Sequence, residues 1–301
     1  MDKQKELHQT LITAGYLHSD DTISLKRLQG GYHNHVFRLQ NQTTEHDWVV
    51  KQFLVGSDNP MFPTLPDDEA AALKMFSGTG LAPDFVGYLP DVSEGAILLY
   101  RFVPGSMWDG DLVAAAQLLY QTHHTPVVGN FRQLPITSDA ILGHAKKIFD
   151  LMNNPEPFLE PLRPYFFKRH VDPAPISPYL IHTDCGPGNM ITGPEGTCLI
   201  DWQCPGIGDP VEDLTIFVSP AIQILYARDP LTLAERDLFL ESYGDPTILA
   251  RFERLNLFYR LRFMAYSAYR IESLAETDPE ISQRYQTAFD AELAYIREQN
   301  L

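Results

Sequence analysis

The segment that decides the fold lies between residues 180 and 202, where two apolar stretches flank a loop of polar and turn-forming residues. It reads Leu180-Ile181-His182-Thr183-Asp184-Cys185-Gly186-Pro187-Gly188-Asn189-Met190-Ile191 and, after a turn, Cys198-Leu199-Ile200-Asp201-Trp202. Its polar positions follow the pattern H-x-D-x-x-x-x-N, and a second Asp ends the later apolar stretch. The turn at residues 193–196 predicts a hairpin that brings Asn189 and Asp201 to one end.

Three side chains of this segment suit phosphoryl transfer. That reaction needs a carboxylate that orients and deprotonates an acceptor hydroxyl, and oxygen ligands that hold Mg²⁺ against the phosphates. Asp184, Asn189 and Asp201 supply these groups. Each residue alone is also typical of an ordinary loop, so the complete pattern between two apolar stretches is what favours the interpretation.

The rest of the chain predicts two lobes. A chain of 301 residues exceeds a single core of about 100 to 200 residues. The first third is rich in strand signals, and the remainder shows helical spacing of apolar residues, which together predict an α+β protein with a hinge at residues 100–105. The expected strands are 23–28, 35–40, 47–54, 84–89 and 95–102. The expected helices are 3–15, 67–76, 111–123, 138–152, 214–226, 233–243, 247–275 and 279–299.

These motifs resemble those of the aminoglycoside phosphotransferase and choline kinase family, which are small-molecule kinases. The resemblance runs from Gly30-Gly31-x-x-Asn34-x-Val36-Phe37-Arg38 to Asp209-Pro210-Val211-Glu212-Asp213-Leu214. It implies a protein-kinase-like two-lobed fold, with a small β-rich nucleotide-binding lobe at 1–102 and a larger, mainly helical catalytic and acceptor-binding lobe at 103–301. It also implies ATP and Mg²⁺ as cofactors, Asp184 as the catalytic base, and Asn189 and Asp201 as metal ligands.

The first lobe should then hold the lysine that contacts the phosphates. The strand around Lys51 looks like the lysine-bearing strand of kinases. Glu69 is expected to pair with Lys51, because the apolar spacing of the following helix turns it inward; Asp67 and Asp68 are alternatives.

Further nucleotide contacts are expected from the loop before the second strand and from the hinge. Gly30, Gly31 and Asn34 would cover the phosphates, although two adjacent glycines alone are more often just a tight hairpin turn. Tyr100 and Phe102 would line the nucleotide site at the hinge.

Several residues near the motif are expected to be structural. His182 is interpreted as a residue that braces the loop, Asp209 as a helix cap and Asp213 as the acceptor of a structural hydrogen bond. Thr183 occupies the position of the arginine that receives a phosphate in protein kinases, so gating by phosphorylation is not expected. A nucleophilic Cys185 beside His182, and metal binding by the pair His123-His124, are the less favoured alternatives.

The composition of the chain limits the kinds of molecule that it is expected to bind. With 23 Lys and Arg against 39 Asp and Glu, the net charge of −16 repels phosphate backbones and disfavours nucleic acid. The sequence has no apolar run of membrane-spanning or signal-peptide type, which predicts a cytoplasmic protein without a membrane partner. The expected partner is a small-molecule hydroxyl acceptor, and the oligomeric state is left open.

The nature of the acceptor is also left open. Aromatic residues of the 247–275 helix belong to a core or to a wall for a cationic acceptor, and the acidic net charge favours an amino alcohol or an aminoglycoside. The aromatic residues are Phe258, Tyr259, Phe263, Tyr266 and Tyr269, and the candidate acids are Asp109, Asp111, Glu272 and Glu276. The alternative is a neutral or anionic hydroxy compound such as homoserine or a sugar, and Arg260, Arg262 and Arg270 would suit an anionic one. A non-catalytic nucleotide-binding protein is the rival hypothesis, disfavoured because Lys51, Asp184, Asn189 and Asp201 are all present.

Overall fold

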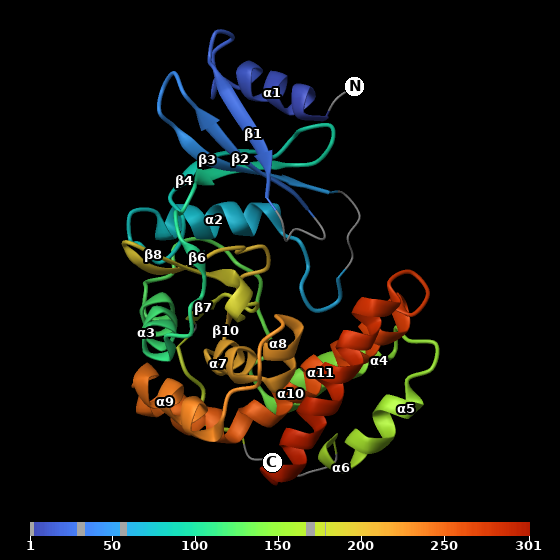
Figure 1. Cartoon of the computed structure of the whole chain (residues 1–301). Helices are drawn as coiled ribbons and strands as arrows, with labels where there is room; N and C mark the ends of the chain where they lie inside the picture. The colour runs from blue at the N-terminus through green and yellow to red at the C-terminus, as the bar shows by residue number, and fades with distance from the viewer. Residues whose placement is uncertain (1–2, 29–33, 55–58, 167–171, 178) are drawn as a thin grey trace.

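The computed structural model describes residues 3–28, 34–54, 59–166, 172–177 and 179–301. A smaller part built on an antiparallel sheet lies above a larger part that consists mainly of helices (Figure 1). This arrangement confirms the predicted α+β, two-lobed fold.

The sheet of the smaller part has five antiparallel strands in the order β1-β2-β3-β5-β4. The strands are β1 (Ile23–Arg27), β2 (Asn34–Asn41), β3 (Asp47–Phe53), β4 (Phe85–Leu89) and β5 (Ile97–Arg101). All five predicted strands are therefore present, and the first three form the expected meander.

The alternation of side chains along the strands decides which residues face the larger part. On β5, Ile97 and Leu99 join a cluster beneath α1 (Lys3–Thr13), whereas Leu98 and Tyr100 join the main core with α2 (Pro66–Phe76). On β3, Val50 faces α1 in the same way. The odd-numbered neighbours of Val50, including Lys51, therefore lie on the side that faces α2 and the helical part.

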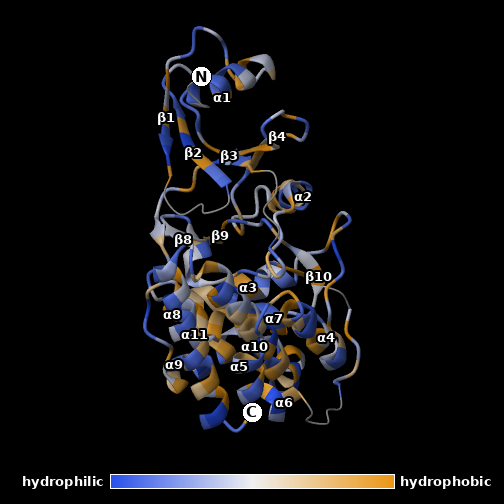
Figure 2. Cartoon of the chain, turned by 90° about the vertical axis from the view of Figure 1, so that its right-hand side faces the viewer, coloured by the Kyte–Doolittle hydropathy of each residue, from blue (hydrophilic) through white to orange (hydrophobic). Residues whose placement is uncertain are grey.

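The larger part surrounds one long helix. Its helices are α3 (Leu112–His123), α4 (Ser138–Phe149), α5 (Glu156–Leu159), α6 (Arg163–Phe166), α7 (Val211–Val218), α8 (Pro220–Leu225), α9 (Leu233–Tyr243), α10 (Pro246–Leu274) and α11 (Pro279–Glu298). Helix α10 packs against α4, α7 and α11, and most of its residues from 248 to 268 are buried. Figure 2 shows hydrophobic segments where these helices meet. No helix in the described ranges is both long and apolar enough to cross a membrane.

The single helix predicted at 214–226 is wrong. The structure has two helices there, α7 and α8, which meet at Ser219 in an extended conformation (φ −69°, ψ 124°). Pro220 is the cause, because proline lacks the N–H that would continue a helix and disfavours helical geometry in the preceding residue. The Ser219 side chain caps the new helix by accepting the N–H of Ile222.

Short strands between the two parts carry the sequence motif. The hairpin of β8 (Met190–Gly193) and β9 (Gly196–Leu199) pairs Met190 with Leu199, as predicted, and β6 (Ser106–Met107) pairs with β8. A second small sheet joins β7 (Tyr179–Ile181) to β10 (Gly206–Gly208). Residues 182–189 lie between β7 and β8, in the region below α2 (Figure 1).

Candidate active site

The loop of residues 182–189 is held by one buried carboxylate. Asp213, in the first turn of α7, accepts the backbone N–H groups of His182 at 2.8 Å and Thr183 at 2.7 Å. Burial opposes the charge of Asp213, but its hydrogen bonds with His123 and with the backbone N–H of His182 outweigh burial, so its pKa lies below the usual range. The predicted structural role of Asp213 is confirmed.

Two histidines complete this support. His182 Nδ1 accepts the N–H of Asp184 at 3.2 Å, and its Nε2 donates to the Ile200 carbonyl at 2.9 Å, so the ring joins the loop to the strand end before Asp201. Burial lowers the pKa of His182, which keeps the ring neutral. His123, on α3, bonds Asp213 at 3.0 Å and Tyr243 at 3.0 Å. Sequence reasoning missed His123 as a loop support, because its partners lie far away in the chain.

Asn189 and Asp201 meet at the end of the hairpin, as predicted. The Ile200 N–H donates to the Asn189 carbonyl at 2.9 Å, and Asn189 Nδ2 donates to the Asp184 carbonyl at 2.7 Å. Asp201 follows in a left-handed backbone conformation (φ 60°), which is uncommon for a residue other than glycine. Its carboxylate is 38% exposed.

Lys51 links the two lobes. Its Nζ donates to both carboxylate oxygens of Glu69, at 2.9 and 2.7 Å, and also bonds the Asp201 carboxylate. Burial opposes the lysine charge, but the two carboxylates more than compensate and raise the pKa of Lys51. Glu69 is therefore the partner of Lys51, whereas Asp67 accepts the hydroxyl of Tyr88 at 2.7 Å instead.

A cavity of about 220 Å³ lies beside Lys51, between the sheet and the β8–β9 hairpin. Its lining residues are Leu28, Asn34, Val36, Val49, Lys51, Pro83, Tyr100, Phe102, Val103, Met107, Gly188, Asn189, Ile191, Ile200 and Asp201. The predicted contacts Asn34, Tyr100 and Phe102 thus share one cavity with Lys51, Asn189 and Asp201. Asn34 is 5% exposed, and its Oδ1 has no hydrogen-bond partner in the described part of the chain. Gly30 and Gly31 lie outside the described residues.

The carboxylate of Asp184 is within electrostatic range of that of Asp201. Burial, with a contribution from the charge of Asp201, raises the pKa of Asp184 to about 8. The neighbouring Cys185 is fully buried and donates its thiol to the Asp213 carbonyl, and burial raises its pKa well above the usual value. A protonated, enclosed thiol is a poor nucleophile, which argues against Cys185 as the reacting group.

The residues present fit a magnesium ion shared with a nucleotide. Asn189 uses its amide nitrogen on Asp184, which leaves its side-chain oxygen for a cation, and Asp201 is partly exposed. Oxygen ligands of this kind suit Mg²⁺. The described residues contain no group of three or more His, Cys, Asp or Glu side chains placed to hold a metal. Phosphate oxygens and water would have to complete the coordination, as is usual for Mg²⁺.

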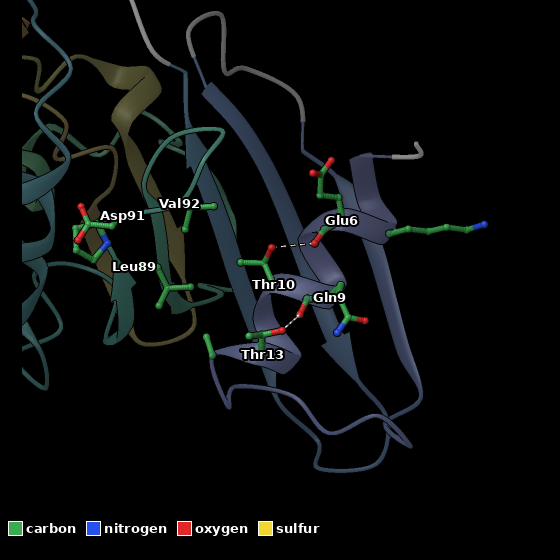
Figure 3. A pocket seen from close by; sticks show the side chains of 10 residues that line it. Glu6, Gln9, Thr10, Thr13, Leu89, Asp91 and Val92 are labelled. Atoms are coloured by element: carbon green, nitrogen blue, oxygen red, sulfur yellow. Dashed lines mark hydrogen bonds between the residues drawn. The ribbon is translucent and has the colours of Figure 1, made fainter.

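A larger depression of about 770 Å³ lies elsewhere, between α1 and the loop after β4 (Figure 3). Its walls include Gln9, Thr13, Leu89 and Val92. Thr10 and Thr13 donate their hydroxyls to carbonyls of their own helix, so these groups stabilise α1. None of the predicted site residues lines this depression.

Two predictions for substrate-binding arginines are wrong. Arg260 is fully buried and bonds Glu292, and Arg262 is buried against Glu212. Both arginines neutralise glutamates inside the core and are inaccessible to a substrate. The aromatic residues of α10 are mostly core as well, since Phe258, Tyr259, Phe263 and Tyr266 are at most 4% exposed.

The predicted cap at Asp209 is correct only in part. Its Oδ1 accepts the N–H of Val211 at 3.1 Å at the start of α7. Its Oδ2 binds the guanidinium of Arg251, which is buried on α10. Asp209 therefore joins α7 to α10 in addition to capping.

Comparisons with known proteins identify the family and the fold of the chain. A model of a phosphotransferase enzyme family matches residues 24–258. Comparison with curated proteins finds no match. Among solved structures, a choline/ethanolamine kinase family protein from Mesorhizobium loti has a TM-score of 0.66 at 17% identity, with 98% of this chain and 99% of that chain covered.

Two further solved structures share the fold. An ethanolamine kinase from Plasmodium vivax has a TM-score of 0.68 at 12% identity, with 97% of this chain and 89% of that chain covered. A spectinomycin phosphotransferase in complex with ADP and spectinomycin has a TM-score of 0.60 at 16% identity, with 98% of each chain covered. Since the family model matches more than half of the residues, the chain belongs to the phosphotransferase enzyme family and is a small-molecule phosphotransferase.

Proposed function

We propose that the protein transfers the γ-phosphoryl group of ATP to a hydroxyl of a small molecule, with Mg²⁺ as the cofactor. The observation that carries this proposal is the meeting of Lys51, Glu69 and Asp201 from three different elements, next to Asn189 and Asp184. A buried lysine with two acidic partners beside a mixed apolar and polar cavity is the arrangement that phosphate handling requires.

Each residue has a distinct role in this proposal. Lys51, oriented by Glu69, binds phosphate oxygens, and Tyr100 and Phe102 contact the base or the sugar at the hinge. Asn189 and Asp201 would hold Mg²⁺, which when bound neutralises charge on the phosphates. Asp184 orients the acceptor hydroxyl and takes its proton as the phosphoryl group is transferred.

In this proposal the two lobes have different roles. We place the boundary after residue 102, so that residues 1–102 bind the nucleotide and residues 103–301 supply the base and the acceptor site. The complex of a structural neighbour with ADP and spectinomycin supports this use of the fold, because that protein combines a nucleotide and a small molecule.

The test measures ADP formation from ATP and Mg²⁺ with a panel of hydroxyl acceptors. We expect at least one acceptor to stimulate ADP formation, and Asp184→Asn to lower turnover about 10²- to 10⁴-fold while nucleotide binding persists. Asp237→Asn is the matched control, because Asp237 is 59% exposed and pairs only with its neighbour Arg236 in the described ranges. Nucleotide binding without acceptor-dependent turnover would instead support the rival regulatory hypothesis.

A further inference from the structure

Three tyrosines from three helical segments gather beside the loop that carries Asp184; we call them the tyrosine cluster. They are Tyr226 at the end of α8, Tyr266 on α10 and Tyr285 on α11. The ring of Tyr226 lies against Gly186 and Gly188, where a Cβ atom at residue 186 would come within 2.5 Å of the ring. The rings of Tyr266 and Tyr285 meet edge to face, with centroids 6.1 Å apart.

A hydrogen bond anchors the cluster to the segment before α2. Asn59 Nδ2 donates to the Tyr266 hydroxyl at 2.8 Å. Burial raises the pKa of Tyr226 and of Tyr285, and the nearby negative charge of Asp184 adds to both shifts. The cluster therefore lies within electrostatic range of the proposed base, on the side formed by the helices.

Arg270 supplies the cluster with a positive charge for which the described ranges contain no carboxylate partner. Its guanidinium lies 5.6 Å from the centre of the Tyr285 ring. Among the described residues no carboxylate lies within 4.0 Å of it, and its Nε is buried without a hydrogen-bond partner. Arg260 and Arg262 on the same helix each have a buried glutamate. Arg260 Nη2 and Arg262 Nε also lack a hydrogen-bond partner, so the absence of a carboxylate partner among the described residues is what distinguishes Arg270 from them. A largely desolvated guanidinium without a counter-ion is costly, and the carboxylate of a ligand would supply that counter-ion.

The charges around Arg270 disfavour a cationic acceptor. The guanidinium already lies near the Tyr285 ring and would repel an ammonium group there. Two of the four acids that the sequence suggested for a cation, Asp111 and Glu272, have other partners in the described structure. Asp111 caps α3 by accepting the N–H of Ala114, and Glu272 accepts the N–H groups of Asn153 and Asn154 at 2.8 Å each.

We propose that the acceptor is a small hydroxy acid whose carboxylate binds Arg270, while its hydroxyl faces Asp184. This proposal rests on the proposed function. The planar guanidinium fits a carboxylate, and a single positive charge balances a monoanion. A dianionic phosphate ester fits less well, because the single guanidinium balances only one of its two negative charges.

The experiment compares acceptors that differ by one carboxylate. The pairs are L-homoserine with 3-amino-1-propanol, L-serine with ethanolamine, and glycerate with ethylene glycol; choline is added as a cation. Binding is measured as the shift in thermal midpoint in the presence of AMP-PNP, and transfer is measured as ADP formation from ATP and Mg²⁺. The proteins are wild type, Arg270→Gln, Arg270→Lys and Arg254→Gln, where Arg254 is an exposed arginine of the same helix.

We expect at least one acid to bind wild type about 10- to 100-fold more tightly than its partner without the carboxylate, as for a charge-assisted hydrogen bond. Arg270→Gln should remove this preference, Arg270→Lys should keep part of it, and Arg254→Gln should not change it. A preference that survives in Arg270→Gln would overturn the proposal, and so would equal binding within every pair or the absence of binding by all three acids.

The two proposals fail in different ways. Binding of an acid through Arg270 without ADP formation would support this inference and count against the proposed phosphotransfer. ADP formation with choline or ethanolamine alone would support the proposed function and overturn the hydroxy acid.

Discussion

The Oδ1 atom of Asp213 accepts the backbone N–H of Thr183 at 2.7 Å, one residue before the proposed base. Thr183 has a left-handed backbone conformation (φ 68°), which costs on the order of 1–2 kcal/mol for a residue with a side chain. Its hydroxyl donates to the Cys204 carbonyl at 2.8 Å, which adds a second restraint. The folded core thus holds a strained residue in place, and that residue sets the direction of Asp184.

Asp213→Asn should therefore loosen the loop. The amide carries no charge and only one acceptor oxygen, so His123 and the two backbone N–H groups lose part of their hydrogen bonding. We expect the free energy of unfolding to fall by about 2–4 kcal/mol, as measured by urea denaturation, and turnover to fall as well. The exposed Asp237→Asn should leave both unchanged. Normal turnover and stability in Asp213→Asn would show that the loop does not depend on this carboxylate.

Close packing of Tyr226 on the loop gives a second prediction. Gly188→Ala would place a methyl carbon 1.9 Å from an atom of the Tyr226 ring. Because this is far closer than van der Waals contact, the ring or the loop must move. We expect a loss of about 1–3 kcal/mol in the free energy of unfolding and a lower turnover in the ADP assay. Gly143→Ala, within α4, is the control, since nothing lies within 4 Å of the added Cβ and alanine is the better helix former. Equal effects of the two substitutions would contradict this packing.

The sequence predicted the parts of the site that depend on local pattern. The hairpin of Asn189 and Asp201 follows from two apolar stretches and a glycine turn, and the direction of Lys51 follows from alternation along β3. The break at Pro220 was missed because apolar helical spacing continued through it. Contacts of His123, Arg270 and Tyr285 could not be predicted, because they depend on how distant helices pack. From the sequence, Arg260, Arg262 and Arg270 are equivalent candidates for binding an anion. In the structure, the first two differ from Arg270 because each pairs with a buried glutamate.

The contact of Lys51 with Asp201 gives a third prediction. Asp201→Asn removes a charged oxygen ligand, so we expect productive use of ATP and Mg²⁺ to be lost, with no recovery at higher Mg²⁺. Lys51 keeps Glu69 as a partner in this variant, so the fold should persist, as a thermal melt would show. Asp91→Asn, an exposed change in the loop after β4, is the control. A magnesium titration that matches wild type would remove Asp201 from the metal site.

A half-buried histidine, His144, makes the fold sensitive to mild acid. His144 Nε2 contacts the Pro60 carbonyl at 3.2 Å, between α4 and the segment before α2. Burial, with a contribution from the charge of Arg262, lowers the pKa of His144 from 6.5 to about 4. Between these two values the unfolded chain binds a proton that the folded chain does not bind. Stability contributed by neutral His144 is therefore complete above pH 6.5 and is lost as pH falls toward about 4.

We accordingly expect the urea midpoint of wild type to fall between pH 7.5 and pH 5. His144→Gln keeps an N–H donor for the Pro60 carbonyl but does not titrate, so its midpoint should fall less over the same range. The buried His182, whose pKa is lowered in the same direction, leaves a residual dependence in the variant. His18→Gln changes an exposed histidine and should follow wild type. If the midpoints of His144→Gln and wild type fall by the same amount, protonation of His144 does not limit stability in this range.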